Sequence, residues 1–161
     1  MVEEIAISLI ENFGYIGIFI VSAISSATVI LPLPGFLAIP IAATSLNPFL
    51  IGIFGGLGAT VGEMVGYGIG IGSRKLSLKA KKDLDIWFTR LSELFKKYNG
   101  FLIIIIFSAT PLPFDVIGLF AGIIKYDVKK FFLATLIGRT MLYMILAYAS
   151  VLGIDAITNL I

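Results

Sequence analysis

The sequence contains no cysteine and no histidine. A chain without these residues has no disulfide, no thiolate nucleophile, no imidazole base and few of the ligands that zinc or copper prefers. No P-loop, G-x-G-x-x-G or G-x-S-x-G motif occurs either, so the many glycines do not predict a phosphate cradle or a nucleophile elbow. We therefore expect a protein that is not an enzyme and that uses no metal or organic cofactor.

Charged residues are also scarce. They make up 14% of the chain, whereas 58% of the residues are hydrophobic and the mean hydropathy is +1.04. Soluble domains contain only about 45 to 50% apolar residues, so the composition predicts an integral membrane protein. The net charge of +2 is too small to favour nucleic acid as a partner, and we expect membrane lipids instead.

Two apolar runs are long enough to cross a membrane as single helices. One extends from about Phe49 to Gly72 and the other from about Phe131 to Gly153. At a rise of 1.5 Å per residue, each can cross a hydrocarbon core of about 30 Å. The sequence therefore predicts an all-α membrane protein with two full crossings.

Paired prolines interrupt the other apolar runs. A proline removes a backbone donor and disfavours helix at the residue before it, so each pair predicts a break at membrane depth. Such irregular backbone is tolerated in a membrane only where protein covers it or where it lines a water-filled cavity. We therefore expect two re-entrant hairpins, with the alternative that the first run spans by itself. The pairs are Pro32 with Pro34, after the run Tyr15 to Leu31, and Pro111 with Pro113, after the run Phe101 to Thr110.

The two halves of the chain repeat one order of motifs. Each half has an apolar run ending in Ser-Ala-Thr, then Pro-Leu-Pro, then a spanning segment that carries Gly62 and Glu63 in one half and Gly138 and Arg139 in the other. A hairpin that returns to its own side, followed by one crossing, leaves the next unit pointing the opposite way, which predicts an inverted repeat. We expect one membrane domain over residues 1–161, with repeats at about 1–72 and 100–153 and a linker at 73–99.

The basic residues gather on one predicted side. Eleven of the twelve lysines and arginines lie in the linker or just after the second hairpin, and the twelfth is Arg139. The positive-inside rule makes that side the cytoplasm. Both termini are acidic and fall outside, so we expect a multi-pass protein of the cell membrane. The acidic residues near the termini are Glu3, Glu4, Glu11 and Asp155.

The linker also carries an amphipathic pattern. Apolar residues recur at intervals of three and four, with lysines and arginines between them, which predicts a helix at the inner membrane interface, anchored by Trp87 and Tyr98. The alternative is a helix that packs on a partner protein. The apolar positions are Leu84, Trp87, Leu91, Leu94, Phe95 and Tyr98.

Three ionisable residues, Glu63, Asp115 and Arg139, lie inside the apolar segments. A charge at the bilayer centre costs about 2.5 to 3.5 kcal/mol on insertion scales, so these residues must be paired or hydrated. Glu63 and Arg139 lie at matching depths on antiparallel helices and can form an ion pair. The alternatives are a purely structural salt bridge, or an Arg139 side chain that extends to the inner headgroups.

Asp115 follows the second proline pair. Its side chain could cap a helix that begins near Val116, or it could take up and release a proton, because burial favours the neutral carboxyl. The corresponding tip of the first hairpin has no acidic residue, so the predicted site is asymmetric.

A stripe of small residues follows the first spanning segment. Gly58, Gly62, Gly66 and Gly70 recur every four residues and predict close helix packing, with a sliding surface for a hairpin or a lipid chain as the alternative.

Several of these motifs resemble the DedA or VTT-domain family, also called SNARE-associated Golgi proteins. The similar stretches are Phe107 to Tyr148, with Pro-Leu-Pro-Phe-Asp, Ala-Gly and Gly-Arg in order, and the glycine-rich run Gly58 to Gly72. The resemblance is closest to short members, and it implies two re-entrant hairpins and movement of lipids between leaflets. The chain departs from the bacterial pattern, which has arginines beside the second proline motif, because Ser108 and Phe114 stand there. Arg139 is thus the only deep cation.

Together these features predict a flippase or scramblase that moves a phospholipid or a polyprenyl-phosphate lipid. Arg139 would attract the phosphate, Glu63 would position it, and Asp115 would exchange a proton if transport is coupled to H⁺ or Na⁺. The alternatives are a small ion-coupled exporter of cations or drugs, and a membrane scaffold that transports nothing. The pathway could lie in one chain or need a homo-oligomer.

Overall fold

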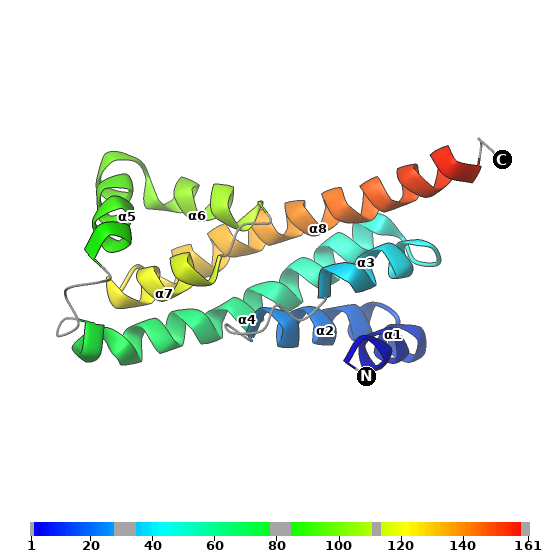
Figure 1. The fold of residues 1–161 in the computed structure, drawn as a ribbon, viewed down its shortest axis with the longest axis horizontal. Coiled ribbons are helices and arrows are strands. Elements are labelled where there is room, and N and C mark those ends of the chain that lie inside the picture. The colour runs from blue at the N-terminus through cyan, green and yellow to red at the C-terminus, as the bar shows by residue number, and fades with distance from the viewer. Residues whose placement is uncertain (1, 28–34, 78–84, 111–113, 159–161) are drawn as a thin grey trace.

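The protein is described by a computed structural model that covers residues 2–27, 35–77, 85–110 and 114–158, and all regular structure in these ranges is α-helical (Figure 1). The predicted all-α class is therefore correct. The helices are α1 (Val2–Phe13), α2 (Tyr15–Ala27), α3 (Gly35–Ala43), α4 (Pro48–Ser77), α5 (Asp85–Lys97), α6 (Gly100–Ser108), α7 (Asp115–Ile123) and α8 (Val128–Thr158).

The two longest helices, α4 and α8, lie side by side and run in opposite directions along the length of the molecule (Figure 1). Each begins at a polar residue that caps it: Asn47 Oδ1 accepts a hydrogen bond from the Phe49 amide at 2.9 Å, and Asp127 Oδ1 accepts one from the Lys130 amide at 2.8 Å. The segments Pro48–Ser73 and Val128–Gly153 are long and apolar enough to cross a membrane. Both predicted crossings are present as helices of the right length and composition.

The remaining helices of the two halves are short. Helix α2 has 13 residues, and α3, α6 and α7 have nine each. At 1.5 Å per residue they reach about 20 and about 14 Å, which is less than the hydrocarbon core. Helix α2 is described as far as Ala27, and the rest of the predicted apolar run, residues 28–31, lies outside the described residues. The prolines that were predicted to break these segments lie outside the described residues: Pro32, Pro34, Pro111 and Pro113.

Each pair of short helices begins and finishes at the same end of the molecule (Figure 1). The Tyr15 hydroxyl, at the start of α2, accepts a hydrogen bond from the Asn47 amide just after α3, at 3.0 Å. In the other half, a Cβ placed on Gly100 at the start of α6 would lie 3.1 Å from the ring of Tyr126, just after α7. Helices α2 and α3 lie at the end that holds both termini, whereas α6 and α7 lie at the opposite end.

Glycines allow the short helices to approach the long ones closely. A Cβ on Gly62 would lie 2.8 Å from the Ser26 Cβ and 2.9 Å from the Ala27 nitrogen, so α4 packs on α2. The predicted packing stripe continues at Gly58, which contacts α2, and at Gly70, which contacts α7. No described atom lies within 4 Å of a Cβ placed on Gly66, so the packing interpretation holds for three of the four glycines.

The second half of the chain has an equivalent contact between a glycine of its long helix and the end of a short helix. A Cβ on Gly138 of α8 would meet the Ser108 hydroxyl and would lie 2.9 Å from the Ala109 nitrogen at the end of α6. Each long helix also packs on the second helix of the other half, α4 on α7 and α8 on α3. The repeated motifs therefore make equivalent contacts in the two halves.

The linker helix exists, but part of its apolar face is not free for lipid or for a partner protein. Leu91 is 6% exposed, and the Phe95 ring centroid lies 5.1 Å from that of Phe120 and 5.9 Å from that of Tyr126. This part of the interfacial prediction is therefore corrected: the described apolar side chains of α5 pack on α6, α7 and the loop after α7. The predicted anchor Tyr98 is 55% exposed, and the side chain of Trp87 is not described.

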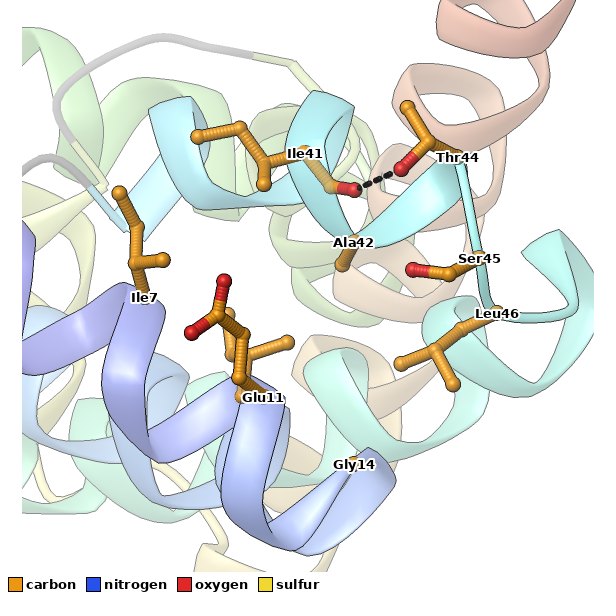
Figure 2. Close-up of a pocket in the computed structure, with 9 residues that line it drawn as sticks. Ile7, Glu11, Gly14, Ile41, Ala42, Thr44, Ser45 and Leu46 are labelled. Carbon is orange, nitrogen blue, oxygen red and sulfur yellow. Dashed lines mark hydrogen bonds between the residues drawn. The ribbon is translucent and has the colours of Figure 1, made fainter.

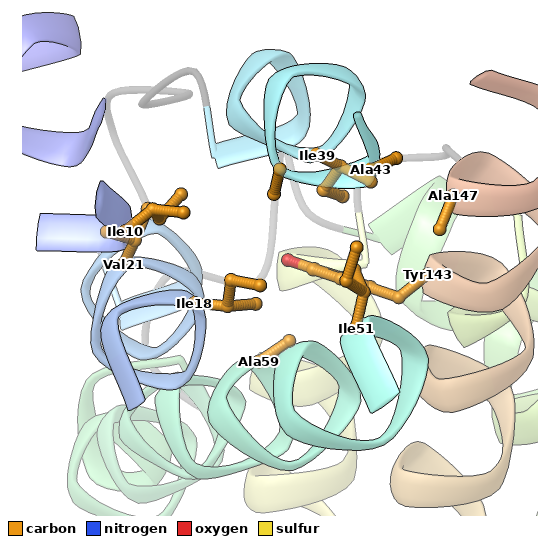
Figure 3. Close-up of a cluster of buried hydrophobic side chains, with 10 residues drawn as sticks. Ile10, Ile18, Val21, Ile39, Ala43, Ile51, Ala59, Tyr143 and Ala147 are labelled. Carbon is orange, nitrogen blue, oxygen red and sulfur yellow. The ribbon is translucent and has the colours of Figure 1, made fainter. Parts of the chain in front are cut away.

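A hydrophobic cluster holds the terminal half together. Helix α1, which the sequence patterns did not predict, ends at Phe13 and is followed by Gly14, whose φ of +56° favours glycine. Figure 3 shows Tyr143 extending from α8 into this cluster toward Ile18 of α2. The cluster thus joins α8 to α1, α2 and α3. Its buried members are Ile10, Ile18, Val21, Ile39, Ala42, Ala43, Ile51, Ala59, Tyr143 and Ala147.

Candidate functional site

An ion pair joins α4 and α8 in the middle of the molecule. The Arg139 Nη2 donates to Glu63 Oε1, and the two residues are only 6% and 1% exposed. Glu63 lies about halfway along α4 and Arg139 about a third of the way along the antiparallel α8. The pairing that the sequence allowed is present, so the Arg139 guanidinium contacts Glu63 and does not extend to the headgroups.

The pair leaves polar atoms without partners. Glu63 Oε2 and Arg139 Nε are buried and have no hydrogen-bond partner among the described residues, and the same is true of Thr135 Oγ1. Thr135 precedes Arg139 by four residues, so both lie on one face of α8. Buried polar atoms cost free energy unless they are satisfied, and this cluster can therefore accept water or a polar ligand. The spacing of four could have identified Thr135 from the sequence.

Aromatic rings form one wall of this polar cluster. The Arg139 guanidinium carbon lies 5.1 Å from the centroid of the Phe114 ring, a cation–π contact. Phe114 stacks on Phe131 at 6.0 Å, and Phe131 stacks on Tyr67 at 4.9 Å. Phe114 is 1% exposed. The position where the resemblance expects an arginine thus holds a ring that covers the single deep arginine.

Asp115 lies near this pair but does not act as a helix cap. Helix α7 begins at Asp115 itself, with Phe114 in the cap position and no side-chain cap hydrogen bond, so the capping prediction is wrong. The charge of Asp115 interacts with those of Arg139 and Glu63. The three ionisable residues singled out in the sequence therefore converge, although they come from three different helices.

Two tyrosines at repeat-related positions connect each long helix to the opposite half. Tyr67 of α4 donates its hydroxyl proton to the Tyr126 carbonyl, just after α7. Tyr143 of α8 is joined by side-chain hydrogen bonds to Ser22 and Ser26 of α2. The ion pair thus lies between two cross-links that hold the halves together.

This arrangement provides one cation, two nearby carboxylates and a buried hydroxyl group. A guanidinium binds phosphate oxygens through planar N–H donors, and a carboxylate beside it can compete for the same donors. In the described ranges no group of three or more acidic side chains could hold a metal ion. Such a set of groups can bind a polar or anionic group through the guanidinium.

A comparison with protein-family models gives a match over most of the chain. A model of the VTT domain matches residues 28–152, which is most of the chain and includes all three ionisable residues of the site. No curated protein and no solved structure matches the chain.

Proposed function

Because the chain belongs to the VTT domain family, which includes the DedA and SNARE-associated proteins, we propose that it moves a phosphate-bearing lipid between the two leaflets of a membrane. The observation that carries this proposal is the central cluster of buried polar atoms without described partners, on Glu63, Arg139 and Thr135. Such atoms are costly in a purely structural salt bridge, and they suit a site that a headgroup or water enters during the transport cycle.

The proposed architecture is an inverted repeat of a re-entrant hairpin and a crossing helix. Three observations support it: the short helices cannot cross alone, each pair begins and ends together, and Gly62 and Gly138 make equivalent contacts. The basic residues of the linker and of the segment after α7 support a cytoplasmic location for that end of the molecule. In this orientation both termini face the outer side of the cell membrane.

In the proposed mechanism a lipid phosphate displaces Glu63 from Arg139. The guanidinium then holds the phosphate, the freed Glu63 carboxylate stays beside it, and Asp115 takes up or releases a proton as the charges separate. A scramblase requires only the polar path, whereas a coupled flippase requires the titrating acid. Cation export is less consistent with the site, because Arg139 already neutralises the deepest carboxylate.

Topology can be tested by single-cysteine labelling, because the natural chain has no cysteine and gives no background. We expect Asn12→Cys and Ser45→Cys to react with a membrane-impermeant maleimide from outside the cell, and Tyr98→Cys and Ile124→Cys only after the membrane is opened. All four positions are exposed. If Asn12→Cys and Ser45→Cys are labelled from opposite sides, the first helix pair crosses the membrane and the inverted-repeat proposal fails.

Transport can be tested in vesicles that contain the purified protein and a fluorescent phospholipid or polyprenyl phosphate. We expect the wild-type protein to accelerate the loss of fluorescence when a quencher is added outside the vesicles. A scramblase should do so with and without a pH gradient. A flippase coupled to protons should do so only with the gradient. Asp115→Asn should abolish the gradient-driven transport of a coupled flippase, whereas it should leave the activity of a scramblase unchanged. Glu93→Gln, an exposed carboxylate on α5, is the matched control. No lipid movement under either condition would refute the proposed function.

A further inference from the structure

A hollow lies at the end of the molecule that holds both termini, away from the central ion pair. It has a volume of about 310 Å³ and lies between α1 and the turn that follows α3. Figure 2 shows the Glu11 carboxylate and the Ser45 hydroxyl both pointing into it, while the Ile7, Ile41 and Leu46 side chains form its apolar wall. The hollow combines an apolar lining with one negative charge.

No lysine or arginine side chain of α1, α2 or α3 lies at this end. The first basic residue in the sequence is Arg74, and no lysine or arginine follows Arg139. The structure gives the Glu11 carboxylate no ion-pair partner among the described residues. The neighbouring hydroxyl of Thr44 is occupied, because it donates to the Ile41 carbonyl at 2.7 Å. The Glu11 carboxylate is therefore available to a cation from outside the chain.

The position of the hollow restricts the kind of cation. Glu11 and Gly14 lie beside the start of α2, and Ser45 lies just before the start of α4, so in the proposed topology the hollow opens where the outer headgroups meet the hydrocarbon core. A small hydrated ion gains nothing from an apolar wall. The charge of an alkylammonium group attached to a lipid can pair with the carboxylate, while its methylene groups pack against the apolar wall.

We propose that this hollow binds the ammonium headgroup of an outer-leaflet phospholipid of the phosphatidylethanolamine type. Glu11 accepts hydrogen bonds from the ammonium, Ser45 offers a further oxygen, and the acyl chains remain in the bilayer. The placement in the outer leaflet depends on the proposed topology, but binding itself depends neither on that topology nor on lipid transport.

The test is native mass spectrometry of the full chain in detergent, with phosphatidylethanolamine or phosphatidylglycerol of identical acyl chains added at equal concentration. An exposed or half-buried ion pair strengthens binding of the oppositely charged ligand by about fivefold at most. We therefore expect the protein to retain about three- to fivefold more phosphatidylethanolamine than phosphatidylglycerol. Glu11→Gln should abolish this preference, and Ser45→Lys should do the same, because an internal ammonium then pairs with Glu11.

Glu4→Gln is the matched control, because it removes one carboxylate from the same helix without lining the hollow, and we expect it to keep the preference. Circular dichroism and gel filtration show whether each variant is folded. If Ser45→Lys fails to fold, Ser45→Ala replaces it, and we expect this variant to lose a smaller part of the preference for phosphatidylethanolamine. Equal retention of the two lipids by the wild type would overturn the proposal, and so would an unchanged preference in Glu11→Gln. Displacement by soluble glycerophosphoethanolamine at equal concentration would show a free headgroup site and overturn the assignment to a lipid. None of these results depends on the vesicle transport assay.

Discussion

Replacing Arg139 with glutamine is expected to destabilise the protein by about 3 to 5 kcal/mol, because the change leaves a buried carboxylate without its counter-charge. Glu63 is 1% exposed, and its other oxygen already lacks a described partner. The measurement is the unfolding midpoint in detergent, followed by intrinsic fluorescence or by the monodisperse fraction on gel filtration. Glu63→Gln should destabilise by a similar amount, since it leaves the guanidinium unpaired.

The double variant Glu63→Gln with Arg139→Gln should recover most of this loss. Two neutral amides can hydrogen-bond to each other, and removing both charges of a buried pair is often close to neutral for stability. Arg90→Gln on α5 is the matched control, because Arg90 is exposed and its loss should change the unfolding free energy by less than about 0.5 kcal/mol. A single variant that unfolds like the wild type would show that the pair contributes nothing to folding.

The same double variant separates structure from transport. If the pair acts only as a structural bridge, the folded double variant should still move lipid in vesicles. If Arg139 holds the phosphate, transport should be lost although the protein is folded. Charge reversal, Glu63→Arg with Arg139→Glu, completes the set: a reversed pair that is no more stable than either single change would refute direct pairing.

Gly138→Leu is expected to prevent α6 from docking on α8. A Cβ at Gly138 would meet the Ser108 hydroxyl and would lie 2.6 Å from the Ile105 carbonyl oxygen, which is backbone and cannot turn aside. Gly138→Ala should already cost about 1 to 3 kcal/mol, the usual price of overpacking a tight contact. Both effects can be measured as a loss of monodisperse protein on gel filtration.

Gly68 provides the control for this experiment. It is exposed on α4, and no described atom lies within 4 Å of a Cβ placed there, so Gly68→Ala should leave stability unchanged or raise it slightly through higher helix propensity. Adding Ser108→Ala to Gly138→Ala should not restore stability, because the clash with the Ile105 carbonyl remains. Full recovery in that double variant would show that only the serine hydroxyl resists the added methyl group.

The sequence was informative where a single helix carries the signal. Apolar runs long enough to cross the membrane became α4 and α8, and the linker periodicity became α5. Local chemistry was less reliable. A cap of α7 was one of two roles left open for Asp115, yet Phe114 occupies the cap position, because the helix begins one residue earlier than the pattern suggested. Helix α1 was not predicted, and its end is set by the positive φ of Gly14.

The contacts of α5 show why patterns alone mislead at a surface. An amphipathic face indicates that something apolar covers it, but the spacing of Leu91, Leu94 and Phe95 cannot distinguish lipid, a partner or the chain itself. The structure resolves this for the described side chains, since Phe95 packs on Phe120 and Tyr126.

By itself, the sequence determined the class of the protein, the number of long apolar helices and the three ionisable residues inside apolar segments, because composition, run length and the cost of a charge in hydrocarbon depend on residue type alone. Only the tertiary structure decided that Arg139 pairs with Glu63 and that Phe114 covers the guanidinium. These are relations between residues on different helices or faces, and they depend on how closely glycines such as Gly62 and Gly138 let those helices approach.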